Sequence, residues 1–213
     1  ACTVGLFASP WLGHTTPLLE VAVGMIAGAC WAGIAALLKR RFAVAEVVST
    51  LLLNFVAANV VGYLVRGPLQ EPTGAYPQSS LLVTVARLPL LIEGQRLHAG
   101  FLIALSLAFA AWWFFRSTAA GFRLRVTGSG RAAAASAGLI KVSSVEMQAL
   151  IASGAIAGLA GACEVTGVTY ALYEGLSPGY GYTAIAVAML GGLHPIAIIA
   201  SAILFGALGA GAD

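Results

Sequence analysis

Three polar side chains recur at every fourth position near the start of a long apolar segment, at Glu46, Thr50 and Asn54. On a helix that turns about 100° per residue, these positions lie within about 80° of one another, together with Ala57 and Val61. An unpaired amide buried away from water costs about 1–3 kcal/mol, so we expect Asn54 to face water, a solute or other helices. The stripe therefore favours two functions: the lining of a path that hydrogen-bonds a polar solute, or hydrogen bonds that hold helices together.

Catalytic chemistry has little support in the sequence. A hydrolase would need a serine and a histidine with further polar partners, and the chain offers Ser153 and His194. The serine stands in the string IASGA, without the usual glycine two residues before it, and no second polar helper accompanies either residue. No Cys and His spacing suits a metal, and the string GSGRAAAASAG lacks the lysine of a phosphate-binding loop. We therefore expect no enzymatic activity, no metal, no cofactor and no bound nucleotide on this chain.

The composition is that of a protein that crosses a membrane several times. Of the 213 residues, 60% are hydrophobic and 9% are charged, and the mean hydropathy is +0.93. Soluble domains have about 45–50% apolar and about 25% charged residues, and disordered or coiled-coil chains are more polar still. A net charge of +3 argues against a nucleic-acid partner, and three cysteines are too few for a disulfide framework.

Apolar stretches of about 20 residues, enough to cross a membrane as helices, divide the chain. We expect spans at 18–38, 47–65, 99–115 and 145–167, and the tail of a further helix at 1–9. The last stretch, 183–211, is interrupted by Gly191, Gly192 and Pro195, so we expect a broken or re-entrant segment followed by a span. One long kinked helix is the alternative. The predicted fold class is all-α, a polytopic membrane helix bundle with about five or six transmembrane helices.

The basic residues indicate the orientation. Two loops without acidic residues hold eight of the eleven Lys and Arg residues: 39–41, and 116–142 with Arg116, Arg123, Arg125, Arg131 and Lys141. Loops rich in Lys and Arg stay in the cytoplasm. We therefore expect 39–41 and 116–142 to be cytoplasmic, and the connections 66–97 and 168–182 to lie outside the cytoplasm.

Glycines repeat at four-residue spacing in two spans, as Gly24 and Gly28 in the first and Gly154 and Gly158 in the fourth. In lipid, helices associate through close backbone contact, which small residues allow. We therefore expect these four glycines to be helix-packing residues.

The fourth span begins with a polar turn. Ser143 and Glu146 have the spacing of a capping box, in which each side chain accepts from the backbone amide of the other residue. An ion pair between Glu146 and a cytoplasmic arginine is the alternative.

The loop 116–142 contains an alanine-rich string, GRAAAASAGL, that would form a short helix along the membrane face. Its basic residues could bind anionic lipid, at about 1 kcal/mol each. A docked cytoplasmic partner is the alternative. The residues that would form this surface are Arg123, Arg125, Gly128, Gly130, Arg131 and Gly138.

Three strings together carry a resemblance to a known family: AEVVSTLLLNFVAANVVGYLVRGPLQEP, GFRLRVTGSGRAAAASAGLIKVSS and SPGYGYTAIAVAMLGGLHPIAIIASAILFGAL. Over residues 18–211 the chain resembles the permease subunits of bacterial ABC importers for simple sugars and nucleosides. The run STLLLN, followed by RGPLQEP, is most similar to the nucleoside-type permeases that work with basic-membrane-lipoprotein binding proteins.

The resemblance implies a subunit that translocates nucleosides by alternating access across the bacterial cell membrane. Its partners would be ABC ATPase subunits, which hydrolyse the ATP, a second permease subunit, identical or paralogous, an extracytoplasmic solute-binding lipoprotein, and membrane lipid. The resemblance places a coupling helix, which docks on the ATPase, around Gly128–Gly138. It also places Thr50 and Asn54 near the translocation path.

Such permeases carry two or three further helices before this region and at least one after it. The resemblance therefore implies that 1–213 is a single permease domain and a piece of a longer protein. A simple sugar such as ribose or galactose is the alternative substrate. A passive channel or membrane scaffold without ATP coupling is the alternative from another functional class.

Overall fold

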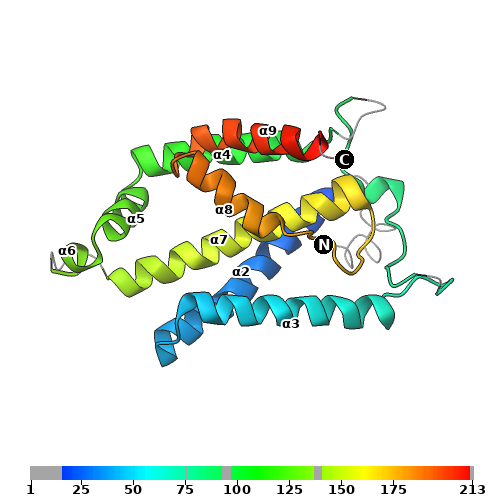
Figure 1. Cartoon of the computed structure of the whole chain (residues 1–213), viewed down its shortest axis with the longest axis horizontal. Helices are drawn as coiled ribbons and strands as arrows, with labels where there is room; N and C mark the ends of the chain where they lie inside the picture. Colours follow the sequence, from blue (N-terminus) through cyan, green and yellow to red (C-terminus); the bar gives the residue numbers. More distant parts are fainter. Residues whose placement is uncertain (1–15, 75, 93–96, 137–140, 212–213) are drawn as a thin grey trace. The chain divides into compact units, whose positions relative to one another are not determined.

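The computed structural model describes residues 16–74, 76–92, 97–136 and 141–211, and these are largely helical (Figure 1). They form two compact units. Unit 1 comprises Ala1–Gly100 and Lys141–Leu176, and unit 2 comprises Phe101–Ile140 and Ser177–Asp213. Each unit is described by itself below.

Among the described residues, four helices are long and apolar enough to cross a membrane. They are α2 (Thr16–Phe42), α3 (Glu46–Arg66), α4 (Gly100–Ser117) and α7 (Val142–Glu164), which the π-helix η3 (Val165–Thr169) extends. The bounds of each helix lie within a few residues of a span expected from the sequence or enclose it. An uninterrupted apolar run of this length can cross a membrane in few conformations other than a helix. The all-α membrane bundle is thus confirmed.

The last apolar stretch forms two shorter helices, α8 (Tyr180–Leu190) and α9 (Pro195–Ala210), which contact one another. Gly192 and Leu193 between them have φ angles of +58° and +57°, outside the helical region. Pro195 lies in the first turn of α9, where its missing N–H costs no hydrogen bond. The broken segment expected here is therefore correct, and the single kinked helix is not formed.

In unit 1, α2 and α7 pack against each other along their glycines (Figure 1). A Cβ added at Gly24 would lie 2.8 Å from the Cβ of Ala162, and one added at Gly28 would lie 2.8 Å from the Cα of Gly158. Cβ atoms at Gly154 and Gly158 would collide with the carbonyl oxygens of Gly28 and Gly24. The two backbones thus approach to a distance that any side chain would prevent.

The helix α3 is packed much more lightly than α2 and α7. Within α3, which is described throughout, the buried residues are Ser49 near one end and Val65 near the other. Large apolar side chains along its length, such as Phe55 and Leu52, are exposed. Most of the α3 surface is therefore left for lipid or for other protein segments to cover.

The segment after α3 has a small core of its own. Leu82 and Ala86, the latter in the short helix η2 (Thr84–Ala86), pack against Val165 of η3. The backbone amides of Leu82 and Leu88 donate to the carbonyls of Tyr170 and Thr166, at 2.8 and 2.9 Å. The connection expected at 66–97 is therefore an ordered structure on the end of α7, in the part of it that is described.

In unit 2, α4 is followed by two short helices, α5 (Ala119–Ser129) and α6 (Arg131–Ser136), which contact one another. Thr118 separates α4 from α5: its hydroxyl accepts from the amide of Gly121 at 3.0 Å and donates to the carbonyl of Phe114 at 2.7 Å. The hydroxyl thus caps one helix and closes the other, so the chain turns within a single residue.

Candidate functional site

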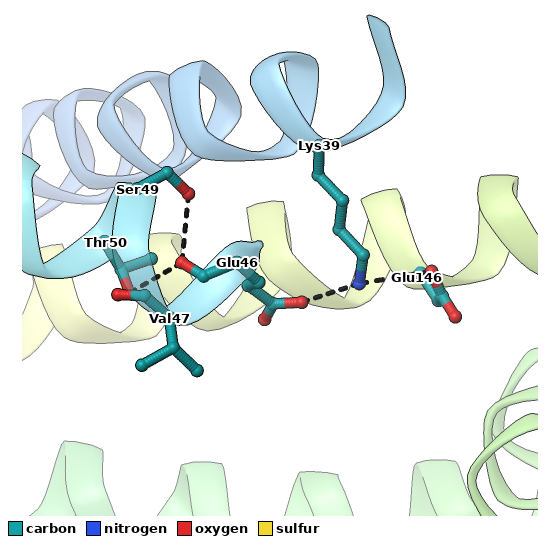
Figure 2. A network of polar contacts seen from close by, with 6 residues as sticks. All are labelled: Lys39, Glu46, Val47, Ser49, Thr50 and Glu146. Carbon is teal, nitrogen blue, oxygen red and sulfur yellow. Dashed lines mark hydrogen bonds and ion pairs between the residues drawn. The ribbon is translucent and has the colours of Figure 1, made fainter. Parts of the chain in front are cut away.

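A single lysine joins the ends of three helices of unit 1 (Figure 2). Lys39 Nζ, in the last turn of α2, lies 2.7 Å from Glu46 Oε2, at the first residue of α3. The same nitrogen lies 3.2 Å from Glu146 Oε2, near the start of α7. All three side chains are partly exposed, so solvent weakens the attraction between their charges.

The capping box expected at the start of α7 is wrong. The residue that precedes α7 is Lys141, and no side chain caps the helix there. Ser143 lies inside the first turn, where its hydroxyl is not in the capping position. Glu146 instead forms an ion pair with Lys39 of α2.

The first two residues of the polar stripe are tied to the Lys39 end of α3. The Thr50 hydroxyl donates to the carbonyl of Glu46 at 2.9 Å and lies 3.1 Å from that of Val47 (Figure 2). The Ser49 hydroxyl also donates to the Glu46 carbonyl, at 2.9 Å. The Thr50 proton is thus engaged within the helix, and its lone pairs stay available to accept a hydrogen bond.

Asn54 lies about 12 Å along α3 from Glu46, eight residues at about 1.5 Å each. Its side chain is exposed, and it has no hydrogen-bond partner among the residues that the structure describes. A bare amide inside a membrane span is expensive, so this face of α3 must meet water, a solute or further protein.

The opposite end of α3 has polar residues that the sequence analysis did not assign to a site. Arg66 Nη2 lies 2.7 Å from Glu174 Oε2, in the loop after η3. Beside this ion pair is a pocket of about 400 Å³, whose lining includes Asn59, Gly62 and Tyr63. Asn59 donates to the carbonyl of Phe55 in its own helix, at 2.8 Å. The spacing of Asn59, Gly62 and Arg66 on one helical face was the signal available in the sequence.

Glu20 is a second residue that the sequence analysis passed over. It is completely buried in α2, and neither carboxylate oxygen has a hydrogen-bond partner in the described structure. It lies four residues before Gly24, on the face of α2 that meets α7. A lone acidic residue at the start of an apolar span was the signal, because ionisable groups are rare there.

The basic loop of unit 2 presents its arginines to the surface. Arg123, Arg125 and Arg131 are exposed on α5 and α6, and a Cβ at Gly128 would meet open space. Gly130 ends α5, whereas Gly138 lies outside the described residues. A depression of about 480 Å³, lined by residues that include Phe122 and Arg125, opens beside α5. The surface therefore combines positive charge with an exposed aromatic ring.

These features define a multi-pass membrane protein in which a lightly packed apolar helix carries a polar stripe and a short helical loop exposes basic residues. Residues 1–212 match the model of the family described as the permease component of the branched-chain amino acid transport system, and the chain belongs to this family. The resemblance to ABC importer permeases is thereby confirmed.

The relatives of the chain include three whose names specify a substrate. The chain is 34% identical to the guanosine ABC transporter permease protein NupP of Bacillus subtilis, over 98% of this chain and 63% of the relative. It is 33% identical to the glucose ABC transporter permease protein TsgB13 of Haloferax volcanii, over 96% of this chain and 58% of the relative. It is 28% identical to the nucleoside ABC transporter permease protein NupB of Lactococcus lactis, over 91% and 56%. The chain spans about three fifths of the length of these relatives. No solved structure matches.

Proposed function

We propose that this chain is the membrane-spanning part of an ATP-driven importer that translocates nucleosides. The observation that carries the proposal is the exposed polar face of α3 in a chain whose relatives include guanosine and nucleoside permeases. A neutral solute with many hydrogen-bonding groups needs such a face to replace water as it crosses.

In this proposal Asn54 and Thr50 line the path, and Glu46 lies at its cytoplasmic end. Asn54 offers donors and an acceptor, and Thr50 offers lone pairs, so both suit sugar hydroxyls and base edges. Alternating access would open this face first to one side and then to the other. The light packing of α3 supports its movement relative to the α2–α7 pair.

The loop 116–142 would be cytoplasmic and would dock on the ATPase subunits, which bind and hydrolyse ATP. Exposed arginines on α5 and α6 and the depression beside Phe122 support a protein partner over lipid alone. The coupling surface would consist of Arg123, Arg125, Gly128, Gly130, Arg131 and Gly138. Because the partner favours one state of the permease, ATP binding would shift the equilibrium between states.

The remaining partners follow from the same assembly. A second permease subunit would cover the exposed apolar faces, and a solute-binding lipoprotein would deliver the solute to the 66–97 side, outside the cytoplasm. Residues 39–41 would be cytoplasmic, and 1–213 would act as one permease domain in the bacterial cell membrane. The glycine contact between α2 and α7 would hold the domain together.

A simple sugar is the second candidate substrate, because the glucose permease of Haloferax volcanii is as similar as the guanosine permease. A sugar offers hydroxyls but no base. It would therefore form hydrogen bonds with the same face of α3 and would need no aromatic side chain to stack on.

The test uses the full-length permease with its ATPase and binding protein in proteoliposomes. We expect ATP hydrolysis to rise with guanosine, adenosine or uridine, and less with ribose or glucose. Stimulation by a sugar alone would support the importer function and rule out nucleosides as its substrate. Absence of stimulation, with no ATPase retained on the permease, would support a channel or scaffold.

A further inference from the structure

The pocket at the Arg66 end of α3 has the composition of a ligand site. We propose that it binds an uncharged nucleoside, as a separate site from the Asn54 stripe; this inference rests on the proposed function. Its volume of about 400 Å³ lies within the roughly 300–1,000 Å³ range of small-molecule sites. Its walls come from α3 and from the loop residue Glu174, all within unit 1.

The pocket lies on a different face of α3 from the stripe. Counted at about 100° per residue, Gly62, Arg66 and Asn59 fall about 120–180° around the helix from Thr50. Asn59 also lies about 10 Å inside the Arg66 end, seven residues at about 1.5 Å. An amide at that depth cannot face hydrocarbon without cost, so the pocket opens to water or to protein.

The groups that line the pocket match the parts of a nucleoside. The Asn59 amide is fixed by its bond to Phe55 and keeps its carbonyl oxygen and one N–H for a base edge. Tyr63 is 73% exposed and presents a ring on which a base can stack. The Arg66 guanidinium keeps N–H donors beyond the one that reaches Glu174, and these suit ribose hydroxyls.

The charges select a neutral ligand. Arg66 and Glu174 form an ion pair at 2.7 Å, so the pocket has no net charge from these residues. A 5′-phosphate would be attracted by Arg66 and repelled by Glu174, so the pair offers no net gain to offset the loss of the phosphate's hydration. Glu174 reaches this position because residue 62 is glycine: a Cβ there would lie 2.6 Å from Glu174 Oε1. The geometry therefore favours a nucleoside over its monophosphate.

The experiment measures equilibrium binding of radiolabelled guanosine to the full-length permease in nanodiscs, without its binding protein. We expect Tyr63→Ala to weaken binding by about ten-fold or more, because it removes the stacking surface. Tyr63→Phe retains the ring and should bind like the wild type. Tyr76→Ala is the matched control, since Tyr76 is also an exposed tyrosine but does not line the pocket.

A second measurement tests the selection by charge. Guanosine 5′-monophosphate should compete weakly with guanosine in the wild type, and about ten-fold better in Glu174→Gln, which removes the negative charge at nearly constant shape. Glucose should not compete.

Three results would overturn the inference: no guanosine binding by the wild type, equal binding by Tyr63→Ala, or competition that Glu174→Gln leaves unchanged. The proposed function fails separately, when uptake by the complete wild-type assembly does not depend on ATP. ATP-dependent guanosine uptake together with unchanged binding by Tyr63→Ala would reject this site and keep the importer.

Discussion

Two ways of holding a membrane helix occur side by side in unit 1. Helices α2 and α7 touch backbone to backbone through Gly24, Gly28, Gly154 and Gly158. Helix α3 has few buried residues and is held near its ends, by Lys39 at one and by Glu174 at the other. The first arrangement tolerates no displacement, whereas the second resists it through bonds that can break and re-form.

The difference follows from how the energy of each kind of contact changes with distance. A gap of about 0.5–1 Å between closely packed atoms already removes about a quarter to a half of their dispersion energy, so a glycine contact weakens over a very short distance. An exposed ion pair weakens gradually with separation and contributes about 0.2–1 kcal/mol. A helix fastened by ion pairs can therefore tilt at low cost, and this suits the helix that carries the polar stripe.

The largest effect is expected from a substitution that separates α2 from α7 at their glycine contact. Gly158→Ala places a Cβ against the carbonyl oxygen of Gly24, and such overpacking costs about 1–3 kcal/mol. Gly161→Ala is the control on the same helix, because a Cβ there meets open space and alanine favours the helix by about 0.8–1 kcal/mol. Thermal unfolding of both variants in detergent measures the difference. Equal melting temperatures would contradict the close contact.

The next effect concerns the lightly packed helix α3. In the proposed path Asn54 hydrogen-bonds the solute, so Asn54→Leu should raise the KM for uptake about two- to ten-fold, at about 0.5–1.5 kcal/mol per bond. Val56→Leu is the control, since Val56 is exposed on another face of α3. If Asn54→Leu transports with an unchanged KM and kcat, Asn54 does not line the path.

A smaller effect is expected at the Lys39 cluster. Lys39→Met leaves Glu46 and Glu146 without their shared cation and should lower Tm by about 2–4 °C, which corresponds to about 1 kcal/mol. A double-mutant cycle with Glu46→Gln isolates the pair. Lys141→Met, at the residue before α7, should change Tm little. Full additivity of the Lys39 and Glu46 variants would show that the two residues do not interact.

The smallest effect is a pH dependence in the segment after α3. Hydrogen bonds from Gln78 and Thr73 lower the pKa of Glu71 below its ordinary value of 4.5. A carboxyl whose pKa is lower in the folded state stabilises the fold above pH 4.5, and this stabilisation is lost as the pH falls through the folded pKa. Glu71→Gln should therefore differ from the wild type above pH 4.5 and approach it in acid. A constant difference at all pH values would exclude this contribution.

The sequence predicted the elements better than the contacts between them. Spans and the break before Pro195 follow from local runs of apolar residues, glycine and proline, which act over a few residues. The pairing of Lys39 with Glu146 joins positions 107 apart, and that of Arg66 with Glu174 joins positions 108 apart. Helical periodicity carries no information on such partners, so Glu146 was assigned to a cap and the pocket at Arg66 was missed.

The glycine contact, by contrast, could be predicted from the sequence, because the pattern itself indicates what it is used for. In lipid few interactions compete with backbone contact, so a four-residue glycine repeat has few other uses. Glu20 was missed because its burial depends on how α2 packs, which the stretch 18–38 alone does not specify.

The π-helix η3 has a consequence for the evolution of this end of the molecule. One π turn contains about one residue more than an α turn, which corresponds to a rotation of about 100° for everything that follows. Loss of one residue from Val165–Thr169 would restore a plain α-helix and swing Tyr170 and Glu174 around its axis, away from Leu82 and Arg66. Insertions or deletions of one residue at this turn would therefore rotate the segment that follows it. They would alter the surface beside α3 and leave the glycine contact between α2 and α7 unchanged.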